Sequence, residues 1–131
     1  MKRTNRKYEF IVEKTNTGFS AYCDKAPIFT SGSTITELND NILEATNLYL
    51  EDEDFEVTMK NIDLSIDLKQ FFQHYRVLNG KFLAKRIGMN ETLLSQYVTG
   101  KKKPSRKQVN KIIDGIQEIG RELSELNLIS A

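Results

Sequence analysis

The chain has 131 residues, of which 39% are hydrophobic and 28% are charged, and its formal net charge is +1. This composition is typical of a globular protein and excludes a disordered chain. Every apolar run is far shorter than a membrane span, and no apolar signal core follows the basic start, so we expect a cytoplasmic protein. The single cysteine, Cys23, excludes an internal disulfide and fits a reducing compartment.

The small net charge hides a division along the chain. Residues 1–69 contain 8 Lys/Arg and 13 Asp/Glu, whereas residues 70–131 contain 11 Lys/Arg and 5 Asp/Glu. Within residues 76–111 there are 10 basic residues and one acid, Glu91. Basic surface confined to one segment is typical of a protein that binds a polyanion. We therefore expect the second half to contact nucleic acid and the acidic first half to contact a basic protein.

The first half begins with a predicted β-hairpin. Apolar residues alternate over 8–13 and again over 19–23, and the turn-forming sequence Asn-Thr-Gly at 16–18 lies between them. Residues 28–30 predict a short third strand, which we expect Gly32 to end.

A helix is predicted next, because Thr34 and Glu37 form a capping box. The apolar residues that follow at helical spacing predict one buried stripe: Leu38, Ile42, Ala45 and Tyr49. Beyond the acidic run 51–54, residues 55–59 and 62–66 alternate in opposite phases. This change of phase predicts strand structure with a bulge or turn at Lys60-Asn61.

Residues 1–66 are thus expected to form a βββαβ domain. The glycine-turn hairpin, the segment Thr-Ser-Gly-Ser-Thr-Ile-Thr-Glu at 30–37 and the helix end Ala45 to Leu50 resemble the HicB antitoxin family. The resemblance implies a small, partial RNase-H-like domain that neutralises a small mRNA-cleaving toxin, HicA. Family members often continue into a DNA-binding module that represses their own operon. The sequence assigns no toxin-contacting residues.

Residues 67–131 are expected to form a helix-turn-helix domain, beginning with a helix whose apolar stripe is Leu68, Phe71, Phe72 and Tyr75. Residues 78–100 then predict two short helices joined by a tight turn. Asn79 is placed to cap the first helix, Gly88 to end it, and Asn90 to cap the second. The expected inward-facing residues are Leu83, Ala84, Ile87, Leu94 and Tyr97.

The sequence Leu-Ala-Lys-Arg-Ile-Gly at 83–88, followed by Leu-Ser-Gln-Tyr-Val-Thr-Gly-Lys-Lys-Lys-Pro-Ser at 94–105, resembles the phage-repressor-like (Xre-type) helix-turn-helix family. This resemblance implies DNA binding, with the second helix in the major groove. The alternative is a pair of amphipathic helices in an ordinary bundle. With either choice the whole chain is predicted to be α+β.

The polar residues of this motif divide into two sets. Four outward-facing residues of the second helix are of the types that read base edges: Glu91, Thr92, Ser95 and Gln96. Seven others are expected to hold phosphates and set the register on the duplex: Asn79, Lys81, Lys85, Thr99, Lys101, Lys103 and Arg106.

A long last helix is predicted to begin at Ser105, whose hydroxyl forms a second capping box with Gln108. Its apolar residues recur at a 3-4-3-4-3 spacing: Val109, Ile112, Ile116, Ile119, Leu123 and Leu126. This spacing suits a dimeric coiled-coil seam and a helix packed on its own domain equally well. Gly115 and Gly120 weaken a free helix, and they are tolerable in a helix on which another backbone packs closely. Edge strands of the first domain are the other candidate dimer contact.

Catalysis is not expected. The carboxylates considered for a metal nuclease are Asp24, Glu37, Asp40 and Glu44, but the last three share the helix face opposite the apolar stripe. His74 is the only histidine, and no phosphate-binding glycine loop is present. We expect no metal site, no cofactor and no enzymatic activity.

Two functions remain. In the first, the chain is an antitoxin and repressor whose partners are double-stranded operator DNA, a small basic HicA-like toxin and further copies of itself. In the second, it is a stand-alone transcriptional regulator whose first domain senses a ligand or dimerises. The sequence leaves open whether toxin binding strengthens or relieves repression.

Overall fold

The computed structural model describes residues 2–130 and has an α+β fold, as predicted. The chain divides between His74 and Tyr75 into two compact units. The first unit contains β1 (Lys2–Arg3), β2 (Tyr8–Thr15), β3 (Gly18–Cys23), β4 (Phe29–Gly32), α1 (Ile35–Tyr49), η1 (Glu51–Glu53), β5 (Phe55–Glu56), η2 (Met59–Asn61), β6 (Ile62–Ile66) and α2 (Leu68–His74). The second contains α3 (Gly80–Ile87), α4 (Glu91–Val98), α5 (Arg106–Ser124) and α6 (Asn127–Ser130).

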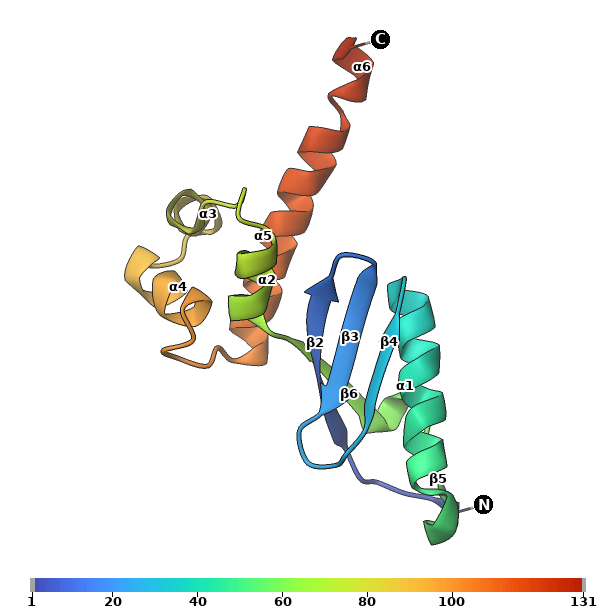
Figure 1. Cartoon of the computed structure of the whole chain (residues 1–131). Coiled ribbons are helices and arrows are strands. Elements are labelled where there is room, and N and C mark those ends of the chain that lie inside the picture. The colour runs from blue at the N-terminus through green and yellow to red at the C-terminus, as the bar shows by residue number, and fades with distance from the viewer. Residues whose placement is uncertain (1, 131) are drawn as a thin grey trace. The chain divides into compact units, whose positions relative to one another are not determined.

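The first unit is built on a four-stranded sheet in the order β4-β3-β2-β6. The predicted hairpin is confirmed: β2 and β3 are antiparallel and pair from Phe10 with Cys23 to Thr15 with Gly18. β6 lies parallel to β2 on its other side, while β1 and β5 form a separate two-stranded pair. Figure 1 shows α1 lying along the sheet. The crossover through α1 is what allows β6 to return parallel to β2.

The core lies between the sheet and α1. Its buried residues are Phe10, Val12, Ala21, Cys23, Ile28, Leu38, Ile42 and Ile62. The predicted stripe of α1 is confirmed at Leu38 and Ile42 but is wrong at Tyr49, which is 49% exposed. The helix ends at Tyr49, and Leu50 is buried directly after it. Thr46 is also buried, because its hydroxyl donates to the Ile42 carbonyl at 2.7 Å.

The capping of α1 is half as predicted. The Thr34 hydroxyl accepts from the Glu37 N–H at 3.1 Å, but the Glu37 carboxylate accepts from the Ser33 hydroxyl. Gly32 is the last residue of β4, so the third strand ends at the glycine expected to end it. A Cβ on Gly32 would lie 2.4 Å from the Leu38 nitrogen, so the absence of a side chain lets α1 approach the strand closely.

The expected turn at Lys60-Asn61 is present as η2, a single turn of 3₁₀-helix. Asn61 is buried, and its amide NH₂ donates to the carbonyls of Thr4 at 2.8 Å and Arg6 at 2.9 Å. Its amide oxygen accepts from the Thr58 N–H at 2.9 Å. One side chain therefore joins the start of the chain to the turn before β6.

The boundary between the units lies eight residues later than the expected one after residue 66. The reason is that α2 continues the pairing of β2: the Asp67 N–H donates to Val12, and the Gln70 side chain both accepts from and donates to the Lys14 backbone. Since residues 70–74 contain no Lys, Arg, Asp or Glu, the division of charge is unchanged. Among residues 2–130, no helix combines the length and apolarity of a bilayer span.

Replacing Asn61 by Ala should lower the free energy of unfolding by about 1–3 kcal/mol, because three backbone groups lose their partner. The control is Asn5→Ala, which alters an exposed asparagine of the same N-terminal segment and should change stability by less than about 0.5 kcal/mol. Urea unfolding followed by circular dichroism measures both. Equal stabilities for the two variants would contradict the role of Asn61.

Candidate nucleic-acid interface

Asn79, Gly88 and Asn90 cap or end α3 and α4 as predicted. The Asn79 amide oxygen accepts from the Phe82 N–H at 3.2 Å, and the Asn90 amide oxygen accepts from the Leu93 N–H at 3.0 Å. Gly88 has φ 70°, the left-handed conformation that ends a helix and favours glycine. The turn between α3 and α4 is thus set by local sequence.

The inner faces of α3 and α4 are also as predicted. Leu83, Ala84, Leu94 and Tyr97 are buried, and Ile87 is half-buried. Together with Ile112 of α5, which is fully buried, these residues make the apolar interior of the second unit. This packing holds the outer face of α4 in a defined orientation toward solvent.

α5 packs closely on α3 at Gly115. A Cβ on this glycine would lie 2.3 Å from Ile87 Cγ2, so a larger residue has no space there. The expected neighbour was another backbone, and at Gly115 the close neighbours are instead the side chains of Ile87 and Leu83, whereas Gly120 has nothing within 4 Å of the same position. Arg86 of α3 reinforces the contact through ion pairs with Glu118, at 3.8 Å, and Glu122 of α5.

The outer face of α4 presents the four predicted base-reading residues. Thr92 and Ser95 are exposed, while Glu91 and Gln96 are half-buried. These positions are separated by one, three, four and five residues, so they share the half of the helix opposite Leu94 and Tyr97. A short helix with a polar, solvent-facing side of this kind has the dimensions to enter a major groove.

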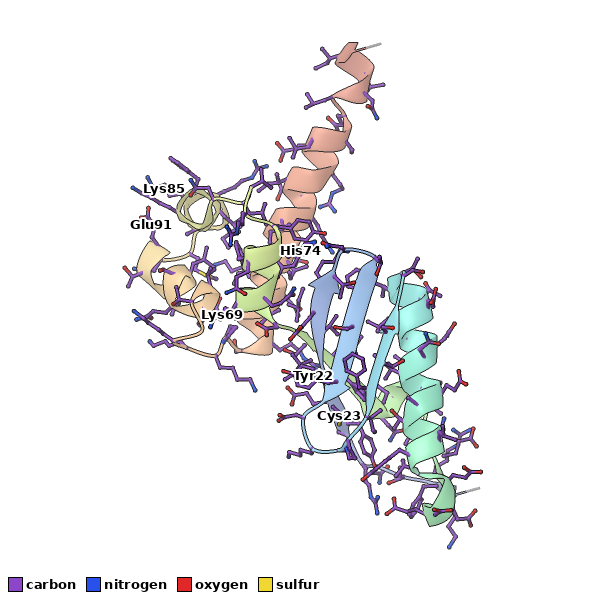
Figure 2. The ribbon with its side chains drawn as sticks, in the orientation of Figure 1. Tyr22, Cys23, Lys69, His74, Lys85 and Glu91 are labelled. Carbon is purple, nitrogen blue, oxygen red and sulfur yellow. The ribbon has the colours of Figure 1, made fainter. Side chains whose placement is uncertain are left out.

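Lys85 and Glu91, predicted for different roles, lie next to each other. The Lys85 ammonium is 3.7 Å from the Glu91 carboxylate and 5.4 Å from the centroid of the Phe82 ring. Figure 2 labels both charged residues, one on α3 and one at the start of α4. The pair offsets the only negative charge of residues 76–111.

The other residues predicted to contact phosphates come from several elements. Lys81 is exposed on α3, Lys101 and Lys103 are exposed in the loop after α4, and Arg106 is exposed at the start of α5. Asn79 caps α3 through its oxygen, and its NH₂ group is a separate donor that the cap does not use.

Thr99 fits a phosphate contact less well. Its hydroxyl donates to the Ser95 carbonyl at 2.8 Å, and a hydroxyl has only one proton to donate. The sequence could not indicate this bond, because threonine near a helix end bonds either to the preceding turn or to a ligand.

Five exposed cations of the same basic segment were not selected from the sequence: Arg76, Arg86, Lys102, Lys107 and Lys111. The one-signed charge of residues 76–111 was the only signal for them. The Lys111 ammonium donates to the Gly88 carbonyl at 3.5 Å. It therefore lies beside the turn between α3 and α4.

Residues 2–130 contain no group of three or more His, Cys, Asp or Glu side chains arranged to hold a metal ion. Cys23 is buried among the apolar residues of the first unit. Comparison with known proteins identifies no relative: the chain matches no family model, no curated protein and no solved structure. The functional inference therefore depends on the residues themselves.

Substituting Ala at Gly115 and at Gly120 should have opposite consequences. Gly120→Ala should stabilise the chain by up to about 1 kcal/mol, because alanine favours the helix and meets nothing. Gly115→Ala should be about 1–3 kcal/mol less stable than Gly120→Ala, because its methyl group overlaps Ile87. Thermal and urea unfolding of the two variants measure the difference. Equal stability of the two variants would show that α5 is not closely packed against Ile87 of α3 at Gly115.

Proposed function

We propose that the chain is the antitoxin of a type II toxin–antitoxin pair and represses its own operon. In this proposal the second unit binds operator DNA through α3, α4 and the loop that follows. The first unit binds and neutralises a small, basic, mRNA-cleaving toxin of the HicA kind. Both activities are those of a cytoplasmic protein without enzymatic activity of its own.

The observation that carries the DNA-binding part is the outer surface of the second unit. A polar helix face on α4 is accompanied by exposed lysines on α3 and in the loop 99–105. Ten of the eleven charged residues in 76–111 are basic, and the one acid is offset by Lys85. A duplex presents phosphates on both sides of the major groove, so positive charge around a polar helix suits it.

The antitoxin part is supported by the resemblance of residues 8–50 to the HicB family and by charge. The first unit, like residues 1–69, has 13 acidic and 8 basic residues. An RNA-cleaving toxin needs a basic surface for its substrate, and an acidic partner associates rapidly with such a surface. The net negative charge of the first unit is therefore complementary to a basic toxin.

The second candidate is a stand-alone regulator with a ligand-sensing first unit. The observation in its favour is an open groove of about 630 Å³ in that unit, whose lining includes the cations Arg3, Lys7 and Lys60. The volume of this groove lies in the range of small-molecule sites. A short neighbouring gene for a basic protein favours the antitoxin, and its absence favours the regulator.

A helix-turn-helix usually binds DNA as a dimer on two half-sites, about one helical turn apart. The apolar residues of the predicted seam differ in their burial within this chain. Ile112 is fully buried within the second unit, whereas Leu123 and Leu126 are 60% and 54% exposed. α5 ends at Ser124, earlier than predicted, and Leu128 and Ile129 of α6 are exposed as well. We propose that this C-terminal apolar cluster pairs with its copy in a second chain.

Light scattering after size exclusion should give twice the 15.1 kDa chain mass at micromolar concentration. The double variant Leu123→Glu/Leu126→Glu should elute as a monomer, because buried unpaired charges oppose the contact. The matched control is Leu48→Glu, which alters a residue of α1 that is 68% exposed and should leave the dimer intact. A monomeric wild-type chain would contradict the proposal.

DNA recognition is tested by comparing Gln96→Ala with Lys103→Ala on a promoter fragment from the protein's own locus and on random duplex. Gln96→Ala should cost about 1–3 kcal/mol on the promoter fragment only, because it removes a base contact. Lys103→Ala should weaken both duplexes alike and reduce the slope of log K against log salt by about 1. Fluorescence anisotropy measures the affinities of the wild type and of both variants for the two duplexes. Equal losses on both duplexes for Gln96→Ala would remove that residue from the readout.

A further inference from the structure

The sheet of the first unit has two faces, and α1 covers one of them. Because side chains alternate along a strand, burial of Phe10, Val12, Ala21 and Cys23 against α1 places the intervening residues on the other face. The strand register then arranges those residues in three parallel rows across the sheet. We call this surface the open sheet face.

The middle row is largely apolar. Ile11 pairs with Tyr22 on one side and Ser65 on the other, and Tyr22 pairs with Phe29. Phe29 is 69% exposed and Tyr22 is 37% exposed, although aromatic residues are commonly buried. Figure 2 labels Tyr22 beside Cys23, the neighbour whose side chain belongs to the core. Directly paired side chains lie about 5 Å apart, so the row is continuous.

The two flanking rows contain carboxylates. On one side, Glu9 pairs with Asp63, and the Asp24 N–H donates to the Glu9 carbonyl. On the other side lies Glu13, paired with Ser20, and Asp67 follows the end of β6. Glu9 and Glu13 are four residues apart on one strand, which separates the rows by about 13 Å. No lysine or arginine belongs to the three rows.

The electrostatics of the face agree with this arrangement. The pKa of Tyr22 is raised, first by burial of its ring and then by the negative charges of Glu13, Asp67 and Asp24. Deprotonation would add a fourth negative charge to the same surface. Carboxylates from β2, the loop after β3 and the loop after β6 therefore act on one aromatic group.

We propose that the open sheet face is the surface that receives the toxin, and that it does so by binding the toxin's basic, RNA-contacting side. This inference rests on the proposed antitoxin function. The carboxylate rows present negative charge on either side of an apolar strip, as phosphates flank the bases of a nucleic acid. Arginine is the side chain that suits both parts, because its guanidinium pairs with carboxylates and stacks on aromatic rings. Occupying the toxin in this way would exclude its RNA.

The test uses the full chain and the small basic protein encoded by the neighbouring gene, with binding measured by calorimetry and stopped-flow fluorescence. Tyr22→Ala should raise the dissociation constant about 30-fold or more, as loss of a central aromatic anchor does. Glu13→Gln/Asp24→Asn should slow association several-fold and weaken its dependence on salt. These two substitutions keep the size of the side chains, so they test the face even if Tyr22→Ala unfolds.

Matched controls lie on α1, which packs on the opposite side of the sheet. Tyr49→Ala removes another half-exposed tyrosine, and Asp40→Asn/Glu44→Gln removes two exposed carboxylates. Both variants should bind the neighbouring protein with the wild-type affinity. Circular dichroism should show a cooperative thermal unfolding transition for every variant.

If the wild type binds tightly and all open-face variants keep full affinity, the open sheet face is not the toxin-binding surface. The proposed antitoxin function would then still stand. Loss of affinity in the α1 controls equal to that of the open-face variants would overturn the face as well. A wild-type chain that does not bind the neighbouring protein would remove the proposed function and this inference together.

Discussion

The alternation of side chains along β2 and β3 is the constraint on which the first unit depends. Once Phe10, Val12 and Ala21 are buried against α1, a shift of one residue in either strand would exchange the two faces of the sheet. The same register therefore fixes the apolar core and the composition of the opposite face. α1 does not cover that opposite face, on which Tyr22 and Phe29 are exposed.

The second unit depends on an equally local set of restraints. Asparagine caps at Asn79 and Asn90 and the left-handed Gly88 define the turn, while Gly115 allows α5 to lie close against α3. The inner residues of α4, Leu94 and Tyr97, hold it against the rest of the unit. Its outer side is free to be polar, and the surrounding lysines make this unit positive while the first unit is negative. Under the proposed function, the opposite signs of the two units would keep their partners separate, with DNA on the positive unit and a basic protein on the negative one.

Sequence reasoning succeeded where the determinant is local. Caps, helix ends and the glycine turn depend on residues within four positions of each other, and all of those predicted for α3 and α4 are present. The prediction was wrong at Tyr49, because helical spacing does not indicate where a helix extends beyond the core. Leu50 is buried in place of Tyr49. The later domain boundary has a similar cause, since the bonds between Gln70 and Lys14 join residues 56 positions apart.

The candidate DNA surface was largely accessible from the sequence, because helix-turn-helix spacing and one-signed charge are both patterns in the chain. Two features needed coordinates: the ion pair between Lys85 and Glu91, and the hydroxyl bond that occupies Thr99. The open sheet face also needed them, because its rows combine residues from four strands whose register no local pattern specifies.

The central claim is that DNA is bound by the second unit while the first unit remains available to a protein. Two-dimensional NMR of the full chain, titrated at low ionic strength with a duplex from its own promoter, tests it most directly. The account predicts that amide shift changes concentrate in residues 79–106 and leave residues 8–66 unaltered. Changes confined to the first unit, or none with any promoter fragment, would contradict it.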